Sequence, residues 1–135
     1  MTMRDFARDR ATVLLGRFVF QMNRAARLRD AESVHDLRVS IRRLQQCLVV
    51  FGQFLPHAQV KKIRRRLHQI MQIAGEVRNR DIALELLGKS GMLAEAAISR
   101  RWRNEAGELR SEFQRLLEHR ARPDLAERWL RRLGL

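Results

Sequence analysis

The chain has 135 residues, of which 45% are hydrophobic, and 28 Lys or Arg against 15 Asp or Glu give it a formal net charge of +13. This length suits a single domain, and the apolar content excludes a wholly disordered chain. All but three of the 28 cations are arginines. A positive charge of this size disfavours cationic ligands and leaves three classes of polyanionic partner: nucleic acid, an anionic membrane and a phosphate polymer.

The sequence indicates neither membrane insertion nor disulfide chemistry. No apolar stretch approaches the roughly 18 residues that span a bilayer, and Met1 is not followed by the apolar core of a secretory signal. The single cysteine, Cys47, can form neither an internal disulfide nor a zinc site with spaced partners. We therefore expect a cytoplasmic protein without metal or cofactor, in which Cys47 is a small apolar core residue.

Helix-forming residues dominate and strand-like alternation is nearly absent, so the fold is predicted to be all-α. A first helix is expected over about residues 3–29, followed by a turn at residues 30–33. The second helix is expected to begin near Ser33, as its N-cap, and to end at Pro56. Its apolar residues alternate in steps of three and four and predict a core-facing seam: Val34, Leu37, Ile41, Leu44, Leu48, Phe51 and Leu55.

The rest of the chain predicts a third helix over about residues 58–87, a fourth over about 93–120 and a short last helix over about 124–133. Gly88 and Gly91 bracket the third break, and Pro123 opens the last helix. The expected seam of the third helix is Val60, Ile63, Leu67, Ile70, Ala74 and Val77, and that of the fourth is Ile98, Trp102, Leu109, Phe113 and Leu116. Amphipathic helices joined by short turns predict an antiparallel four-helix bundle with a short C-terminal helix, as one domain over residues 1–135.

A polar stripe follows each of the two central seams, one residue after its apolar positions. The stripes are His35, Arg38, Arg42 and Gln45 on the second helix, and Lys61, Arg64, His68, Met71, Gly75 and Arg78 on the third. A solvated flank, whose long side chains cover the core edge, is the ordinary explanation of such a pattern. Segment 58–90, however, carries eight Lys or Arg against three acidic residues. If the helices are neighbours, the stripes line one groove, and an anion between them would offset the repulsion of the cations.

Asp81 interrupts the seam of the third helix where an apolar residue is expected. A carboxylate beside a core must be paired or shift its pKa. The expected partners are Arg78, Arg38 or Arg42, and in that arrangement Asp81 would orient their guanidinium groups toward a ligand. Alternatively, the helix bends at Gly75 and leaves Asp81 in water.

Two segments on these helices resemble the CHAD family, the conserved-histidine α-helical domain. Residues 34–44, Val-His-Asp-Leu-Arg-Val-Ser-Ile-Arg-Arg-Leu, match the family pattern His-x-x-Arg-Val-x-x-Arg-Arg-Leu-Arg in spacing and identity. Residues 74–82, Ala-Gly-Glu-Val-Arg-Asn-Arg-Asp-Ile, match the pattern Leu-Gly-x-x-Arg-Asp-x-Asp-Val more loosely. Gln45 stands in place of the last Arg of the first pattern, and Ala74 and Asn79 replace the Leu and the first Asp of the second.

The resemblance implies a non-enzymatic domain that binds inorganic polyphosphate through a basic surface around the family histidine, in some proteins at polyphosphate granules. Carried onto this chain, the implied contacts are His35, Arg38, Arg42, Arg43, Lys61, Lys62, Arg65, His68 and Arg78. Protonation of the two histidines adds charge in mild acid, so binding is expected to strengthen as the pH falls toward about 6.

Family members usually contain two four-helix bundles, about twice the length of this chain. The sequence therefore resembles the first bundle alone, as a half domain by itself or as part of a longer protein. For a half domain we expect a C2 homodimer that rebuilds the two-bundle arrangement. The residues expected at its interface are exposed apolar ones near the C-terminus: Trp129, Leu130, Leu133 and Leu135.

Nucleic-acid binding is the main alternative function, because the charge suits it equally well. Recognition of single strands, however, favours exposed aromatic residues, whereas this chain has no Tyr and its Phe residues lie largely on the seams. An enzyme acting on phosphates is less favoured, because clustered carboxylates and a phosphate-binding loop are missing from the sequence. A helical adaptor for an acidic protein also stays open.

Overall fold

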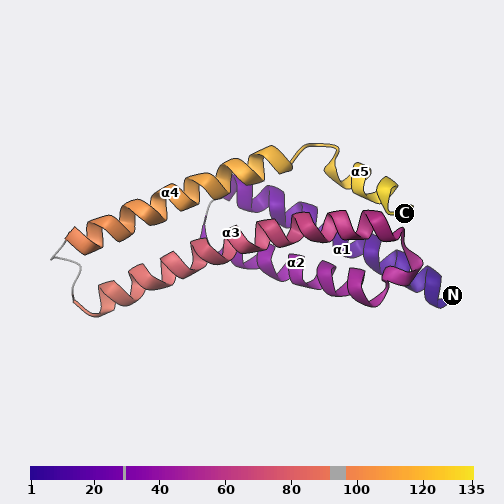
Figure 1. The fold of residues 1–135 in the computed structure, drawn as a ribbon, viewed down its shortest axis with the longest axis horizontal. Coiled ribbons are helices and arrows are strands. Elements are labelled where there is room, and N and C mark those ends of the chain that lie inside the picture. Colours follow the sequence, from indigo (N-terminus) through magenta and orange to yellow (C-terminus); the bar gives the residue numbers. More distant parts are fainter. Residues whose placement is uncertain (29, 92–96) are drawn as a thin grey trace.

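The computed structural model describes residues 1–28, 30–91 and 97–135, which form five α-helices and one 3₁₀ turn. The helices are α1 (Met3–Leu28), α2 (Ala31–Val50), α3 (His57–Lys89), α4 (Ala97–Arg120) and α5 (Leu125–Arg132), and the 3₁₀ turn η1 spans Gly52–Phe54. Successive long helices run antiparallel (Figure 1), which confirms the predicted all-α bundle with its short C-terminal helix.

Each long helix packs against the next one in the chain, and the last two helices also pack against the first. α1 lies along α2, α2 along α3 and α3 along α4, while α4 and α5 also contact α1. The last part of α3 and the first part of α4 project beyond α1 and α2 as a two-helix hairpin (Figure 1). No helix in the described ranges is long and apolar enough to cross a membrane. The predicted helix ends at Arg29 and Leu93 lie outside the described residues.

The start of α2 differs from the prediction. Its N-cap is Asp30, whose side chain accepts a hydrogen bond from the Ser33 amide at 2.8 Å, while the Ser33 hydroxyl donates to the Asp30 carbonyl at 2.9 Å. The predicted turn at residues 30–33 and the predicted N-cap at Ser33 are therefore wrong, because Asp30 is an equally good cap one turn earlier. The helix also ends sooner than predicted, at Val50, and η1 precedes Leu55.

The seams of α2 and α3 form the centre of the core, as predicted. All six predicted α3 positions are buried, and on α2 only Phe51 is half-buried. The α4 seam is partly wrong: Ile98 is 48% exposed, and the buried line runs through Ala106, Phe113 and Leu117. In α1, Leu28 near the C-terminal end is exposed. The far end of α4 lacks a partner from α1 or α2, which explains the exposure of Ile98.

The C-terminal helix α5 folds back onto α1. Trp129 and Leu133 are buried, and the Trp129 ring stacks on Phe18 with a centroid distance of 5.5 Å and an interplanar angle of 9°. Leu130 and Leu135 are half-buried against the same core. The prediction that these residues are exposed is therefore wrong for Trp129 and Leu133, because α1 of the same chain supplies the apolar surface that α5 needs.

Candidate functional site

The polar stripes of α2 and α3 face each other across a groove, here called the α2–α3 groove. Gln45 and Arg64 join the two helices: the Gln45 Nε2 donates to the Arg64 carbonyl at 3.1 Å, and the Arg64 Nε donates to the Gln45 Oε1 at 3.3 Å. The groove beside this contact has a volume of about 590 Å³. Arg42 and His68 line it, together with apolar side chains that include Val49. Two of the contact residues predicted from the sequence, Arg42 and His68, therefore line the same groove.

Three arginines gather along the same pair of helices: Arg38 and Arg42 from α2 and Arg78 from α3. Burial, and then repulsion by Arg42 and Arg78, lowers the pKa of the Arg38 guanidinium below its ordinary value. The Arg38 Nε is buried and has no hydrogen-bond partner among the described residues. A buried donor without an acceptor and a set of like charges both cost free energy. An anion bound among these three side chains would reduce both costs.

The remaining predicted contacts surround this cluster at different positions. His35 is exposed one turn before Arg38 on the α2 stripe, and Lys61 is exposed one turn before Arg64 on the α3 stripe. Lys62 and Arg65 are also exposed on α3, and none of these four residues lines the groove itself.

Arg43 lies on the opposite flank of α2. It lines two shallow hollows that α1 completes, one with Arg10 and one with Arg17. Arg43 therefore faces α1 rather than the groove, because an α-helix turns by about 100° between successive residues.

Asp81 is paired, but with a residue that the sequence did not indicate. The Nη2 of Arg110 in α4 donates to both carboxylate oxygens of Asp81, at 2.7 and 2.6 Å. Arg80 forms a second ion pair across the same helices, with Glu105 at 3.0 Å. Asp81 thus joins α3 to α4, and the predicted pairing with the arginines of the α2–α3 groove is not what the structure contains.

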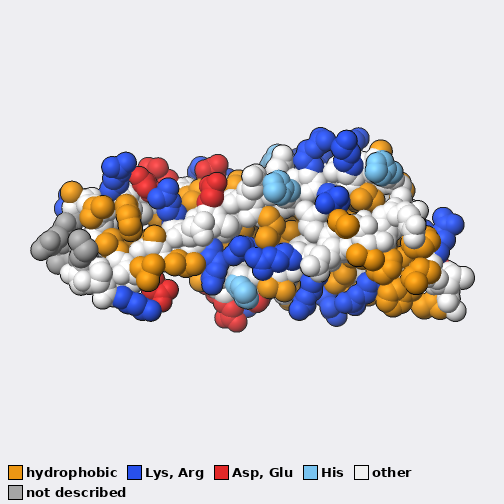
Figure 2. Space-filling model, turned by 60° about the horizontal axis from the view of Figure 1, so that its bottom comes forward, with side chains coloured by type: hydrophobic (Ala, Val, Ile, Leu, Met, Phe, Trp, Pro, Cys, Tyr) orange, Lys and Arg blue, Asp and Glu red, His pale blue; other side chains and the backbone are white. Residues whose placement is uncertain are grey.

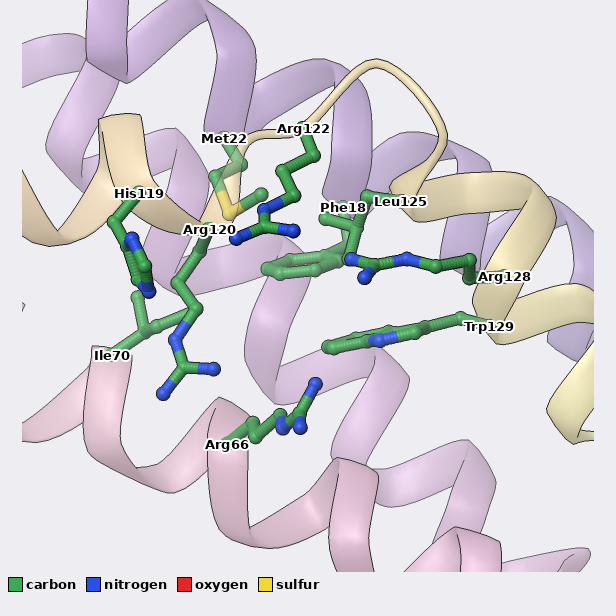
Figure 3. A pocket seen from close by; sticks show the side chains of 10 residues that line it. All are labelled: Phe18, Met22, Arg66, Ile70, His119, Arg120, Arg122, Leu125, Arg128 and Trp129. Atoms are coloured by element: carbon green, nitrogen blue, oxygen red, sulfur yellow. The ribbon is translucent and has the colours of Figure 1, made fainter.

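A second basic cluster was missed by the sequence analysis. Arg66, Arg120, Arg122 and Arg128, with His119, surround a pocket of about 160 Å³ between α1, α3, α4 and α5 (Figure 3). Four of these residues lie within residues 119–128, but Arg66 comes from the middle of α3, so no local spacing pattern connects the whole cluster. The signal in the sequence was the density of arginine near the C-terminus, with six in residues 115–132.

The charges are unevenly distributed over the molecule. On the face shown in Figure 2, Asp and Glu side chains lie in the half nearer the α3–α4 hairpin. The half nearer the chain termini carries Lys, Arg and His among hydrophobic side chains. In the described part of the chain, no three His, Cys, Asp or Glu residues are grouped so that they could hold a metal ion.

Fold and surface together define a helical-bundle domain with a strongly cationic surface. The chain belongs to the CHAD domain family, whose model matches residues 15–134. This family is associated with polyphosphate binding, and its members are generally non-catalytic binding domains. No curated protein and no solved structure matches the chain.

Proposed function

We propose that this protein binds inorganic polyphosphate beside the α2–α3 groove, at the cluster of Arg38, Arg42 and Arg78, of which Arg42 also lines the groove. The observation that supports the proposal is the buried Arg38 Nε, which has no acceptor among the described residues and lies near the charges of Arg42 and Arg78. His35, Lys61 and His68 would extend the contact along the stripes. Lys62, Arg65 and Arg43 lie outside the groove and would contribute through the positive field alone.

Polyphosphate fits the chemistry of this cluster. Its phosphate units are closely spaced anions, and a guanidinium group can grip two phosphate oxygens while staying charged at any physiological pH. The stretch from His35 to Arg42 covers about 10 Å along α2, so one short run of phosphates could contact several of its side chains. Binding of this kind releases counterions and therefore weakens steeply as salt is added.

The two ends of the groove differ in chemistry. Val49 and Val50 line the end near Gln45 and are 59% and 65% exposed, whereas the three arginines lie toward the other end. Phosphates gain nothing from apolar walls. The proposal therefore predicts that Val49→Ser leaves polyphosphate affinity unchanged.

The test is a calorimetric titration with long-chain polyphosphate and with single-stranded RNA of matched charge, at about 150 mM salt, where attraction between exposed charges is largely screened. The double variant Arg38→Ala, Arg42→Ala is compared with Arg4→Ala, Arg100→Ala, which removes the same charge from exposed positions on α1 and α4. We expect polyphosphate to bind more tightly than RNA. The groove variant should lose at least about tenfold in affinity, since each hydrogen bond to a charged group is worth about 1.5–3 kcal/mol.

Two results would contradict the proposal. Equal affinity for both polyanions, unaffected by the groove variant, would mean that the +13 charge acts without a specific site. Equal losses in the two double variants would lead to the same conclusion. Tighter binding of RNA would favour the nucleic-acid alternative.

Assembly and location stay predictions. If two copies rebuild a two-bundle domain, light scattering at micromolar concentration should give twice the chain mass. Such an interface would have to avoid Trp129 and Leu133, which are already buried within the chain. Location at polyphosphate granules would follow from the binding proposed here.

A further inference from the structure

The pocket between α1, α3, α4 and α5, here called the α5 pocket, has an apolar base. Phe18 and Met22 of α1 and Leu125 and Trp129 of α5 are all buried and line it. Figure 3 shows the Trp129 ring lying parallel to Phe18, with Arg122 and Arg128 on one side of it and Arg66 on the other. The base is therefore a rigid apolar surface.

The upper part of the same pocket is cationic. Four arginines and one histidine reach it, and none of its lining residues is acidic. In Figure 3 the guanidinium groups of Arg122, from the linker, and Arg128, from α5, approach each other beside Phe18, while Arg120 and Arg66 reach the pocket from α4 and α3. The buried Arg128 Nε forms an ion pair with the Asp124 Oδ2 at 3.5 Å, without a hydrogen bond among the described residues.

Arg66 is partly buried and lies near other cations. Burial, followed by the charges of Arg120, Arg132 and Arg128, lowers the pKa of the Arg66 guanidinium. The C-terminus of α4 attracts cations and accounts for His119 and Arg120 on their own. It does not account for Arg66, which comes from the middle of α3.

Another explanation is that the arginine side chains merely cover Trp129 and Phe18 with their aliphatic stems. Long cations that serve only as cover direct their charged groups outward into water. Here four arginine side chains, from α3, α4, the linker and α5, all line one small pocket. The first turn of α5 also begins at this hollow, with no side-chain hydrogen bond capping it, so the positive end of the helix dipole is directed toward the pocket.

We propose that the α5 pocket is a second anion site, which binds one small phosphate-type oxyanion such as inorganic diphosphate. Its volume of about 160 Å³ corresponds to about five water molecules at about 30 Å³ each, which suits a small oxyanion and excludes a nucleic-acid helix. Arg66, Arg120 and Arg122 would hold the oxygens, with Arg128 at the side. The site is separate from the α2–α3 groove and does not depend on polyphosphate binding there.

Trp129 provides a direct reporter. The chain has two tryptophans, so Trp102→Phe leaves the buried indole of Trp129 as the sole tryptophan beside the pocket. In this background, diphosphate should change the tryptophan fluorescence in a saturable way and raise the melting temperature. Arg66→Gln, Arg120→Gln should weaken this response at least about tenfold. Without ligand, the same variant should melt at the same temperature as the parent or higher, because it removes repelling charges.

Two controls separate this site from general charge effects and from the groove. Arg115→Gln, Arg131→Gln removes the same charge from exposed positions on α4 and α5, and Arg38→Gln, Arg42→Gln alters the groove. Both should keep the Trp129 response. Loss of the response in the charge-matched control, or no saturable response in the parent, would overturn the proposal. If Arg66→Gln, Arg120→Gln loses helical circular dichroism, Arg122→Gln in the exposed linker makes the same test.

Discussion

Replacing Trp129 with alanine tests how firmly α5 is fixed to the bundle. The side chain is 2% exposed and stacks on Phe18, so the substitution removes a buried ring from the core. Its Nε1 has no hydrogen-bond partner among the described residues, so no hydrogen bond is lost with it. The cost is therefore the cost of losing burial and stacking.

Truncation of a buried aromatic side chain costs about 3–5 kcal/mol, of which stacking contributes about 0.5–1.5 kcal/mol. This is a large part of the roughly 5–15 kcal/mol by which domains are stable. We expect Trp129→Ala to lower the free energy of unfolding, measured by urea titration with circular dichroism, by about 3–5 kcal/mol. The melting temperature should fall by roughly 10 °C or more.

Two controls sharpen the measurement. Trp102→Ala makes the same chemical change at a half-buried position on α4 and should cost less than half as much. Trp129→Phe keeps an aromatic ring over Phe18 and should recover most of the loss. A cost below about 1 kcal/mol, or one equal to that of Trp102→Ala, would refute the docking of α5. A cost that changes with protein concentration would place Trp129 in a dimer interface instead.

Four further predictions follow from local features. Gly16→Ala should raise the free energy of unfolding by about 0.5–1 kcal/mol, because an added methyl group on α1 would meet open space there. Gly91→Ala should lower the free energy of unfolding by about 1–2 kcal/mol, because residue 91 has φ +75°, a left-handed conformation that disfavours a side chain. Burial raises the pKa of the Cys47 thiol, so thiol-specific labelling at pH 8 should be slow in native protein and fast in urea. Hydrogen bonds from Ser33, in the first turn of α2, lower the pKa of the Asp30 carboxyl in the folded protein. The ionised carboxylate therefore stabilises the fold fully above the unfolded-state pKa of about 3.9. This contribution disappears as the pH falls through the lower pKa of the folded state. Asp30→Ala should therefore lower the melting temperature at pH 7 and have no effect in strong acid. Arg38→Met should leave the melting temperature without ligand unchanged or higher and should weaken polyphosphate binding.

The seams of α2 and α3 could be predicted because each is a local repeat, in which steps of three and four place residues such as Ile41 and Leu67 on one face. The stripe beside each seam followed from the same geometry, and so did the expectation that the two stripes face each other when the helices are neighbours. These features depend on neighbours along one helix or on two helices joined by a short turn.

Features that depend on more distant pairings could not be predicted in this way. Asp81 had several arginines within reach in the sequence, and the structure selected Arg110, which lies 29 residues away on α4. The apolar face of α5 was visible, but amphipathicity alone does not say whether a helix covers its own chain or a partner. The α5 pocket could not be predicted for both reasons: it depends on a distant pairing and on where α5 packs. Arg66 lines it together with residues of α5, which begins almost sixty residues later in the chain.

The projecting α3–α4 hairpin implies that stability is graded along the length of the molecule. Its far end consists of α3 and α4 alone, and the apolar residues Ile82, Leu86 and Ile98 there are 41%, 61% and 48% exposed. Segments with few buried apolar contacts open at a lower free energy than the global unfolding transition. Backbone amides there should exchange with solvent deuterium sooner than those packed on α1 and α2. The ion pairs of residues 80 and 81 with α4 would mark the boundary where exchange slows, and any molecule that covers the hairpin would remove this gradient.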